Sequence, residues 1–378
     1  MTPSPLAIKQ YFRRIKDPRI NRHKRHLLID IIAITICGVI CGCNDWQQIA
    51  VFAKSRRDWL AKFLRLPNGI PSHDTLERVF DRLAPEAFQS CFRDWTQALH
   101  DALGLSQIAI DGKSLRGSAT EGFKALHLVS AWATANALSL GQVATEEKSN
   151  EITAIPKLLE LLNLHGALVT IDAMGCQKAI AAKIVDGGGH YVLTVKENQP
   201  NLLDDIQECL NRAFDIDFKG LVSDLWETEE RGHGRHEKRS YTILEDPTGI
   251  RGLENWKGLC VIGMCVSETT RNGVTSEEVR YFIGSKRADA KTYGMALRNH
   301  WRIENTLHWQ LDVSFGEDRN RVSKRHGAEN LALVRRLALS LLKQHPAKLS
   351  IACKRLRAAL DPGFLEEVLH GNGCSGKV

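Results

Sequence analysis

Hydrophobic residues recur with the period of an α-helix along the first hundred residues of the chain. Gly42, the Pro67-Asn68-Gly69 turn and Pro85 interrupt this pattern, and Ser72 or Asp74 is placed to cap the third segment. The chain is therefore expected to begin with four short helices. Their expected ranges are 27–41, 46–64, 75–83 and 86–103.

At residue 105 the pattern changes to short apolar runs separated by segments of helical spacing. The order is three strands, helix, strand, helix, strand, helix. Strands that alternate with helices are typical of a sheet with parallel members and helices packed on it. The expected strands are 105–111, 125–134, 137–145, 166–172 and 191–195, and the expected helices are 152–162, 178–185 and 201–213.

Residues 215–285 break this rhythm, because they contain mostly strand-like runs. We read them as a β-rich insertion into the α/β domain. The expected strands are 221–227, 239–243, 256–266 and 278–283, and helical patterns follow at 289–312, 328–342 and 349–360.

The predicted fold class is therefore α/β, with an all-helical part in front. We expect a basic arm and a helical N-terminal domain at 1–100. The α/β domain would extend over 101–345, interrupted by the insertion at 215–285. A basic helical tail would occupy 346–378.

Composition narrows the class of protein. The 378 residues are 43% hydrophobic and 25% charged, which is ordinary for a globular protein of two or three domains. No apolar run reaches the ~18 residues of a membrane span, and no secretory signal precedes the helices. The ten cysteines form no CxxC pair. Cys37, Cys41 and Cys43 cluster on an apolar stretch, where cysteine is more often a small hydrophobe than a zinc ligand. We expect a reduced, cytoplasmic protein.

Positive charge is concentrated in two segments. Residues 1–26 carry a local charge of +7 and residues 319–357 a local charge of +10, so the rest of the chain carries −10 within the total of +7. Separated basic blocks on an acidic body suit a protein that binds a polyanion, because neutralised phosphates release counterions. Solvated helix faces explain the same pattern. Whether the N-terminal helices read DNA or form a plain bundle is left open.

Two acidic residues end apolar strands. Asp111 closes one expected strand and Asp172 closes another, each before a glycine-containing turn. Acids at the carboxyl ends of neighbouring strands are placed to share a divalent cation. The alternative is that both are ordinary turn residues.

A third acid lies on the late helix. Glu304 has His300 and His308 four residues to either side, and Asp312 lies at i+8, so we expect these four on one helix face beside Trp301 and Trp309. A charge buried among aromatic residues needs a partner or a metal. Two alternatives remain: a zinc site of His300, Glu304 and His308, and purely structural pairing.

The sequence segments around these acids resemble those of a known family. IDGKSLRG (110–117), EKSNEITAIPKLLELL (147–162), TIDAMGCQ (170–177), YVLTVKENQP (191–200), GHGRHEKR (232–239) and the block at 298–318 resemble the H-repeat-associated proteins, which are bacterial insertion-sequence transposases. The resemblance extends from the helical N-terminus to about residue 345.

This resemblance implies an RNase H-like catalytic domain with the D-D-E triad Asp111, Asp172 and Glu304, separated by 61 and 132 residues. In this family the three acids hold two Mg²⁺ ions, which Mn²⁺ can replace. The implied activity is cutting an insertion sequence at its ends and joining it to target DNA. The implied partners are terminal inverted repeats, target DNA and a second copy of the chain at the nucleoid.

The sequence departs from the wider superfamily around the glutamate. Leu297, His300 and Leu311 stand where that superfamily has Tyr, Arg and Lys, so these phosphate roles are not transferred. The candidates to take over these phosphate contacts, chosen only because they lie near Glu304 in the sequence, are His300, His308, Arg298 and Arg302. The other expected DNA contacts are Lys113, Lys196 and Arg235 in the family-like words, and Arg13, Arg14, Arg22 and Arg25 in the basic arm.

Two other classes of function stay open. A decayed transposase would bind element ends without cutting them. An RNase H-like metal-dependent nuclease would cut branched or damaged DNA without joining ends.

Overall fold

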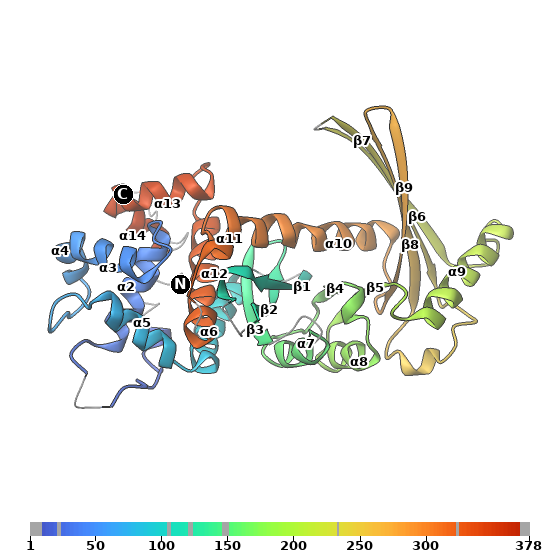
Figure 1. Cartoon of the computed structure of the whole chain (residues 1–378). Coiled ribbons are helices and arrows are strands. Elements are labelled where there is room, and N and C mark those ends of the chain that lie inside the picture. Colours follow the sequence, from blue (N-terminus) through green and yellow to red (C-terminus); the bar gives the residue numbers. More distant parts are fainter. Residues whose placement is uncertain are drawn as a thin grey trace. The chain divides into compact units, whose positions relative to one another are not determined.

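The computed structural model describes residues 10–20, 24–103, 107–119, 124–145, 151–232, 234–322 and 325–370 (Figure 1). The chain forms two compact units. Unit 1 takes residues 1–104, 112–150 and 304–378, and unit 2 takes residues 105–111 and 151–303. No helix in the described ranges is long and apolar enough to cross a membrane.

The N-terminal helices of unit 1 follow the predicted apolar spacing closely. They are α2 (Leu28–Ile40), α3 (Trp46–Ser55), α4 (Arg57–Ala61), α5 (His73–Arg82) and α6 (Pro85–Leu103). Asp45 caps α3 by accepting from the Gln48 amide, and Ser72 caps α5 by accepting from the Thr75 amide, so one of the two predicted caps is confirmed.

Unit 1 also contains strands and the C-terminal helices. Strand β1 (Gln107–Leu115) contributes its second half, from Gly112, and is followed by β2 (Leu126–Ala133) and β3 (Leu138–Thr145), which pair antiparallel. Helix α12 (Arg325–Gln344) packs against α2, α5, α6 and β3. Leu115, Leu128 and Ala332 lie in one buried apolar cluster, which joins the strands to α12.

The remaining helices of unit 1 are α11 (Trp309–Val313), α13 (Ile351–Leu360) and α14 (Pro362–His370). Helix α13 contacts both α2 and α12, and Figure 1 shows α13 and α14 next to α2. The N-terminal helices and the C-terminal helices thus share one unit. The expected boundaries at residues 100 and 345 do not coincide with the units.

Unit 2 is built on parallel strands. The first half of β1 pairs with β4 (Leu168–Ile171), and β4 pairs with β5 (His190–Val195), both in parallel. Helices α7 (Glu151–Glu160), α8 (Lys178–Asp186) and α9 (Pro200–Asp215) alternate with these strands, as predicted. Figure 1 shows α7 and α8 on one side of β4 and β5 and α10 on the other.

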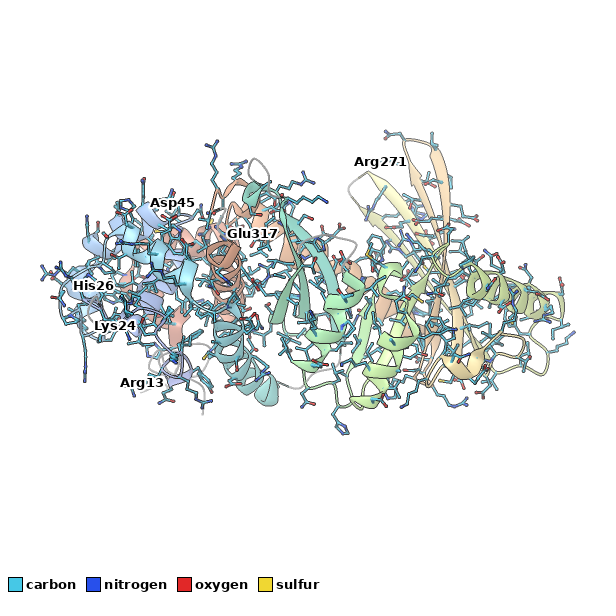
Figure 2. The ribbon with its side chains drawn as sticks, turned by 60° about the horizontal axis from the view of Figure 1, so that its bottom comes forward. Arg13, Lys24, His26, Asp45, Arg271 and Glu317 are labelled. Carbon is cyan, nitrogen blue, oxygen red and sulfur yellow. The ribbon has the colours of Figure 1, made fainter. Side chains whose placement is uncertain are left out.

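The strands of 215–285 are β6 (Ser223–Gly232), β7 (Arg235–Glu245), β8 (Val261–Arg271) and β9 (Val274–Gly284). The residues expected as a β-rich insertion continue the sheet of unit 2. Strand β9 pairs antiparallel with β5, so unit 2 has one sheet in the order β1-β4-β5-β9-β8-β7-β6. The outer ends of these strands extend as long hairpins, and Arg271 lies at the tip of the β8–β9 hairpin (Figure 2).

The late helix is α10 (Ala290–Ile303), which contacts β4, β5, β6 and β7. It ends unit 2, and Glu304 begins the last segment of unit 1. Residues Glu304–His308 form a π-helical turn between α10 and α11.

Candidate active site

The two predicted strand-end acids belong to neighbouring strands. Register pairs Ile110 with Ile171 in the parallel β1–β4 ladder, so Asp111 and Asp172 follow directly as the next pair. Adjacent strands lie about 4.8 Å apart. Both side chains are half-buried. The sheet therefore brings two of the three predicted acids together at one edge.

The turn after β4 fixes the orientation of Asp172. Its Oδ1 accepts from the amides of Met174 at 3.1 Å and Gly175 at 3.4 Å, which caps a short 3₁₀ turn. A Cβ on Gly175 would lie 2.3 Å from the Ile171 side chain, so only glycine fits there. Asn198 Nδ2 donates to the Ala173 carbonyl at 2.7 Å from the loop after β5.

Buried polar side chains fasten α10 to the strands that end in the acids. Gln107 on β1 donates to the Ala296 carbonyl at 2.7 Å and to Thr170 Oγ1 at 3.3 Å. Asn299 donates to Gln107 Oε1 at 3.3 Å, and His300 Nδ1 lies 3.1 Å from Thr170 Oγ1. The roles of Gln107, Thr170 and Asn198 were not predicted from the sequence, although Thr170 and Asn198 lie inside the quoted family-like segments.

Two expectations about Glu304 are wrong. Glu304 is exposed, whereas its aromatic neighbours suggested burial, and His308, four residues on, is 8% exposed. Residues 304–308 form a π turn and not the continuous α-helix that was assumed. Because Glu304 is exposed and His308 is buried, the four residues His300, Glu304, His308 and Asp312 do not form the single stripe that α-helical spacing predicted.

Both histidines are poor candidates for cationic phosphate contacts. Burial lowers the pKa of His300 to about 4, against a weaker opposing effect of its hydrogen bond with Thr170. Burial also lowers the pKa of His308 to about 3, with the charges of Arg336 and Lys113 acting in the same direction. Both rings are therefore neutral at pH 7, and neither replaces the arginine of the wider superfamily.

The donor chemistry at the strand ends fits a hard divalent cation, since both groups are carboxylates on rigid elements. Among the described residues, no three His, Cys, Asp or Glu side chains lie close enough to hold one ion. The pair of aspartates is thus part of a possible metal site. Glu304 belongs to the other unit.

Lys113 does not have the surroundings of a phosphate-binding side chain. Its side chain is 9% exposed, and its ammonium contacts the carboxylates of Asp312, Asp318 (3.2 Å) and Glu317 (3.4 Å). The expected role of Lys113 at DNA is corrected accordingly, because three acids already surround its charge.

The other expected DNA contacts differ in exposure. Lys196 and Arg302 are exposed, Arg235 is 55% exposed and lies 3.3 Å from Glu237, and Arg298 pairs with Glu230. In the basic arm Arg13 and Arg25 are exposed, Arg14 pairs with Asp94 at 3.1 Å, and Arg22 lies outside the described residues. Figure 2 shows Arg13 and Lys24 on the helical part of unit 1.

Part of the basic C-terminal segment is buried. Four of its cations are at most 5% exposed: Arg335, Arg336, Lys354 and Arg355. Lys354 donates to the carbonyls of Leu342 and His345, at the end of α12, at 2.8 and 2.7 Å. Arg355 donates to the Val39 carbonyl near the end of α2 at 2.9 Å. These buried cations donate to carbonyls at helix ends, which have no hydrogen-bond partner within the helix.

A different group of cations, which was not predicted from the sequence, is exposed in unit 1. It lies on α3, on α4 and in the following turn, where Asp58 is the one acid between residues 50 and 66. None of these cations pairs with a carboxylate of another described residue. They are Lys54, Arg57, Lys62 and Arg65.

The sheet and its helices define a mixed α/β protein, in which two aspartates lie next to each other at the ends of neighbouring strands. A profile described as the transposase DDE domain matches residues 103–341, and a second, described as associated with it, matches residues 9–96. The chain therefore belongs to the family of transposases with a DDE domain, which confirms the predicted family.

Two relatives from Escherichia coli extend over nearly the whole chain. "Putative transposase YncI" of strain O157:H7 is 40% identical over 371 residues, which cover 96% of this chain and 94% of the relative. "H repeat-associated putative transposase YhhI" of strain K12 is 38% identical over 376 residues, which cover 96% of this chain and 97% of the relative. A solved piggyBac transposase synaptic complex with hairpin DNA is 10% identical over 98% of this chain and 83% of that chain, with a TM-score of 0.44, too low to support a conclusion.

Proposed function

We propose that this protein cuts an insertion sequence at its ends and joins it to target DNA by phosphoryl transfer. The class of protein follows from the family; the reaction, the RNase H-like character of the sheet and the residues that act are our proposal. One observation carries it: Asp111 and Asp172 follow the last register pair of two parallel strands, so two carboxylates stand side by side at a sheet edge.

Glu304 is the third acid of the proposed site. It follows Ile303, the last residue of α10, and that helix is hydrogen-bonded to β1 and β4 through Gln107 and His300. Glu304 is proposed because the family-like block contains it and because it follows directly, along the chain, a helix fastened to the strands that end in Asp111 and Asp172.

The three carboxylates would hold Mg²⁺, with Mn²⁺ as a substitute. When bound, such ions stabilise the attacking and leaving oxygens of an in-line displacement at phosphorus. The protein contributes orientation: the amides of Met174 and Gly175 fix one oxygen of Asp172, and the neutral ring of His300 adds no charge near the site. Hydrolysis and strand transfer differ only in whether water or a 3′-hydroxyl attacks, so one set of acids serves both.

We propose two DNA-binding surfaces in unit 1, the basic arm (residues 9–25) and the exposed cations of residues 54–65. Unpaired lysine and arginine side chains bind phosphates and make the affinity depend on salt. The proposed DNA partners are the terminal inverted repeats and the target. A homodimer at the nucleoid would hold the two element ends together.

The test is strand cleavage of element-end DNA in Mg²⁺. Asp111→Asn and Glu304→Gln should abolish nicking on a gel while DNA binding stays within about twofold, because phosphate contacts lie outside the carboxylates. Asp186→Asn is the matched control, since Asp186 is an exposed aspartate of the same unit, paired with Lys257.

Other outcomes identify the rival functions. A wild-type protein that nicks DNA but never joins ends is a nuclease. A wild-type protein that binds element ends and does not nick is a DNA-binding protein. An Asp111→Asn variant that still nicks removes Asp111 from the proposed site, and the proposed function fails with it.

A further inference from the structure

Lys113 lies in a cluster of charges in unit 1, in which Lys113 and Glu317 are buried and Asp312 and Asp318 are partly exposed. Its ammonium contacts Asp312 on α11 and then Asp318 and Glu317 in the turn that follows α11. A second cation, Arg336 on α12, is fully buried and donates to Glu317 at 3.1 Å. Figure 2 shows Glu317 among the elements of unit 1.

Both cations act on Glu317. Burial alone would raise the pKa of its carboxyl, but the positive charges of Arg336 and Lys113 outweigh that effect and hold the pKa below its ordinary value. The carboxylate is therefore charged at pH 7 and bound from two sides. This ties the turn at 317–319 to β1 through Lys113 and to α12 through Arg336.

The main chain makes the same connection independently. A Cβ added to Gly117 would lie 2.3 Å from the Asn320 carbonyl oxygen and 2.7 Å from that of Asp318. Residues just after β1 therefore pack directly against the segment that follows α11. Any larger residue at position 117 would push the two segments apart.

The position of this cluster in the chain is informative. Lys113 comes two residues after Asp111, and Asp312 comes eight residues after Glu304, at the end of the π turn and α11. The ion pair thus joins the residues that follow one proposed catalytic acid to the residues that follow another. A buried ion cluster is seldom the most stable way to fill a core, so it is better explained by the geometry it enforces.

We infer that Lys113 is a positioning residue, whose contacts with Asp312, Glu317 and Asp318 hold the segment that follows Glu304 against the residues of β1 that follow Asp111. The inference rests on the proposed function, because it matters only if Asp111 and Glu304 act together. Lys113 itself contacts neither DNA nor the reacting phosphate.

The experiment compares Lys113→Met, which removes the charge, with Lys113→Arg, which keeps it. Lys183→Met is the control, since Lys183 makes an ion pair with a single carboxylate, Glu160, between α8 and α7. The readouts are the single-turnover cleavage rate on saturating, pre-bound element-end DNA, DNA affinity, and Mn²⁺ binding measured by EPR without turnover.

Lys113→Met should cleave roughly 10–100-fold more slowly and bind Mn²⁺ more weakly, with unchanged DNA affinity, as is usual when the support of a metal ligand is lost. Lys113→Arg should recover most of the rate. Lys113→Met with wild-type cleavage and Mn²⁺ binding would overturn the inference. Lys183→Met should match wild type in every readout, and an equal loss there would also overturn it.

A second variant covers loss of folding. If Lys113→Met melts below the assay temperature, Asp312→Asn is used instead. This variant keeps the ion pairs of Lys113 with Glu317 and Asp318. Slow cleavage with near-native melting then supports the inference, and wild-type cleavage overturns it. Asp111→Asn is measured in parallel. If that variant cleaves normally, the proposed function fails; if it is inactive while Lys113→Met is normal, only this inference fails.

Discussion

Replacing Arg355 by methionine tests whether the basic C-terminal helices bind DNA or hold the fold together. The guanidinium of Arg355 donates to the Val39 carbonyl at 2.9 and 3.2 Å, to Asn44 Oδ1 at 3.1 Å and to the Ser314 carbonyl. It also stacks 4.1 Å from the centroid of Phe315. Burial lowers the pKa of Arg355 to about 10, so the group is still charged at pH 7.

The expected loss follows from these contacts. Methionine keeps most of the apolar stem and removes the donors of three acceptors, each worth about 1–3 kcal/mol when it is left buried. Because such losses are not fully additive, we expect about 4 kcal/mol of unfolding free energy, a large share of the roughly 5–15 kcal/mol of a typical protein. That corresponds to a melting temperature lower by roughly 8–16 °C.

The assay is thermal unfolding together with the salt dependence of DNA binding. Arg357→Met is the matched control: Arg357 lies on the same helix, is half exposed, and pairs with Asp361 at 3.9 Å. A surface pair of this kind contributes about 0–1 kcal/mol. Arg355→Met should leave the salt slope of DNA binding unchanged below its melting temperature. If Arg355→Met melts like wild type but its slope of log K against log salt concentration is smaller by about 0.9, this reasoning is refuted.

Three further predictions follow from the same structure. Changing the four exposed cations of residues 54–65 to Gln should flatten the salt slope by up to about 0.9 per lost phosphate contact, and an unchanged slope would show that they are only solvated. Glu317→Gln should destabilise by roughly 3–5 kcal/mol in urea unfolding, because it leaves Arg336 buried with less negative charge, and the double variant with Arg336→Met should recover part of that loss. Finally, the unfolded chain takes up protons near the ordinary histidine pKa of 6.5, whereas folded His300 and His308 do so only near 4 and 3. Stability should therefore be full above pH 6.5 and decrease as the pH falls towards 4, and a pH-independent unfolding free energy over that range would contradict the assigned burial.

The local pattern predicted nearly every helix and strand, because amphipathic periods report on the two faces of an element. Examples are α5 with its cap at Ser72, and β4 ending just before Asp172. Strand pairing was harder. Nothing in 215–285 shows locally that β9 pairs with β5, since that contact joins residues some ninety positions apart, such as Leu193 and Ile283.

The roles of charged side chains were the least predictable part. Lys113 and Arg355 look like surface cations in the sequence, because the groups that bind them come from far along the chain: Glu317 lies 204 residues from Lys113, and Val39 lies 316 residues from Arg355. Glu304 was expected to be buried because Trp301 and Trp309 flank it on what was taken as one continuous α-helix. Residue types alone do not reveal a π turn.

The π turn at Glu304–His308 also sets how this part of the chain can vary between relatives. A π turn holds about one residue more than an α turn, so deleting one residue from it would let it relax to α-helix while the residues after it keep nearly the same direction relative to α10. Trp309 would then stay exposed and Leu311 would stay buried. Deleting one residue within α10 or α11 would instead turn everything after it by about 100°. We therefore expect one-residue gaps in this family to fall within these five residues and to avoid the helices on either side.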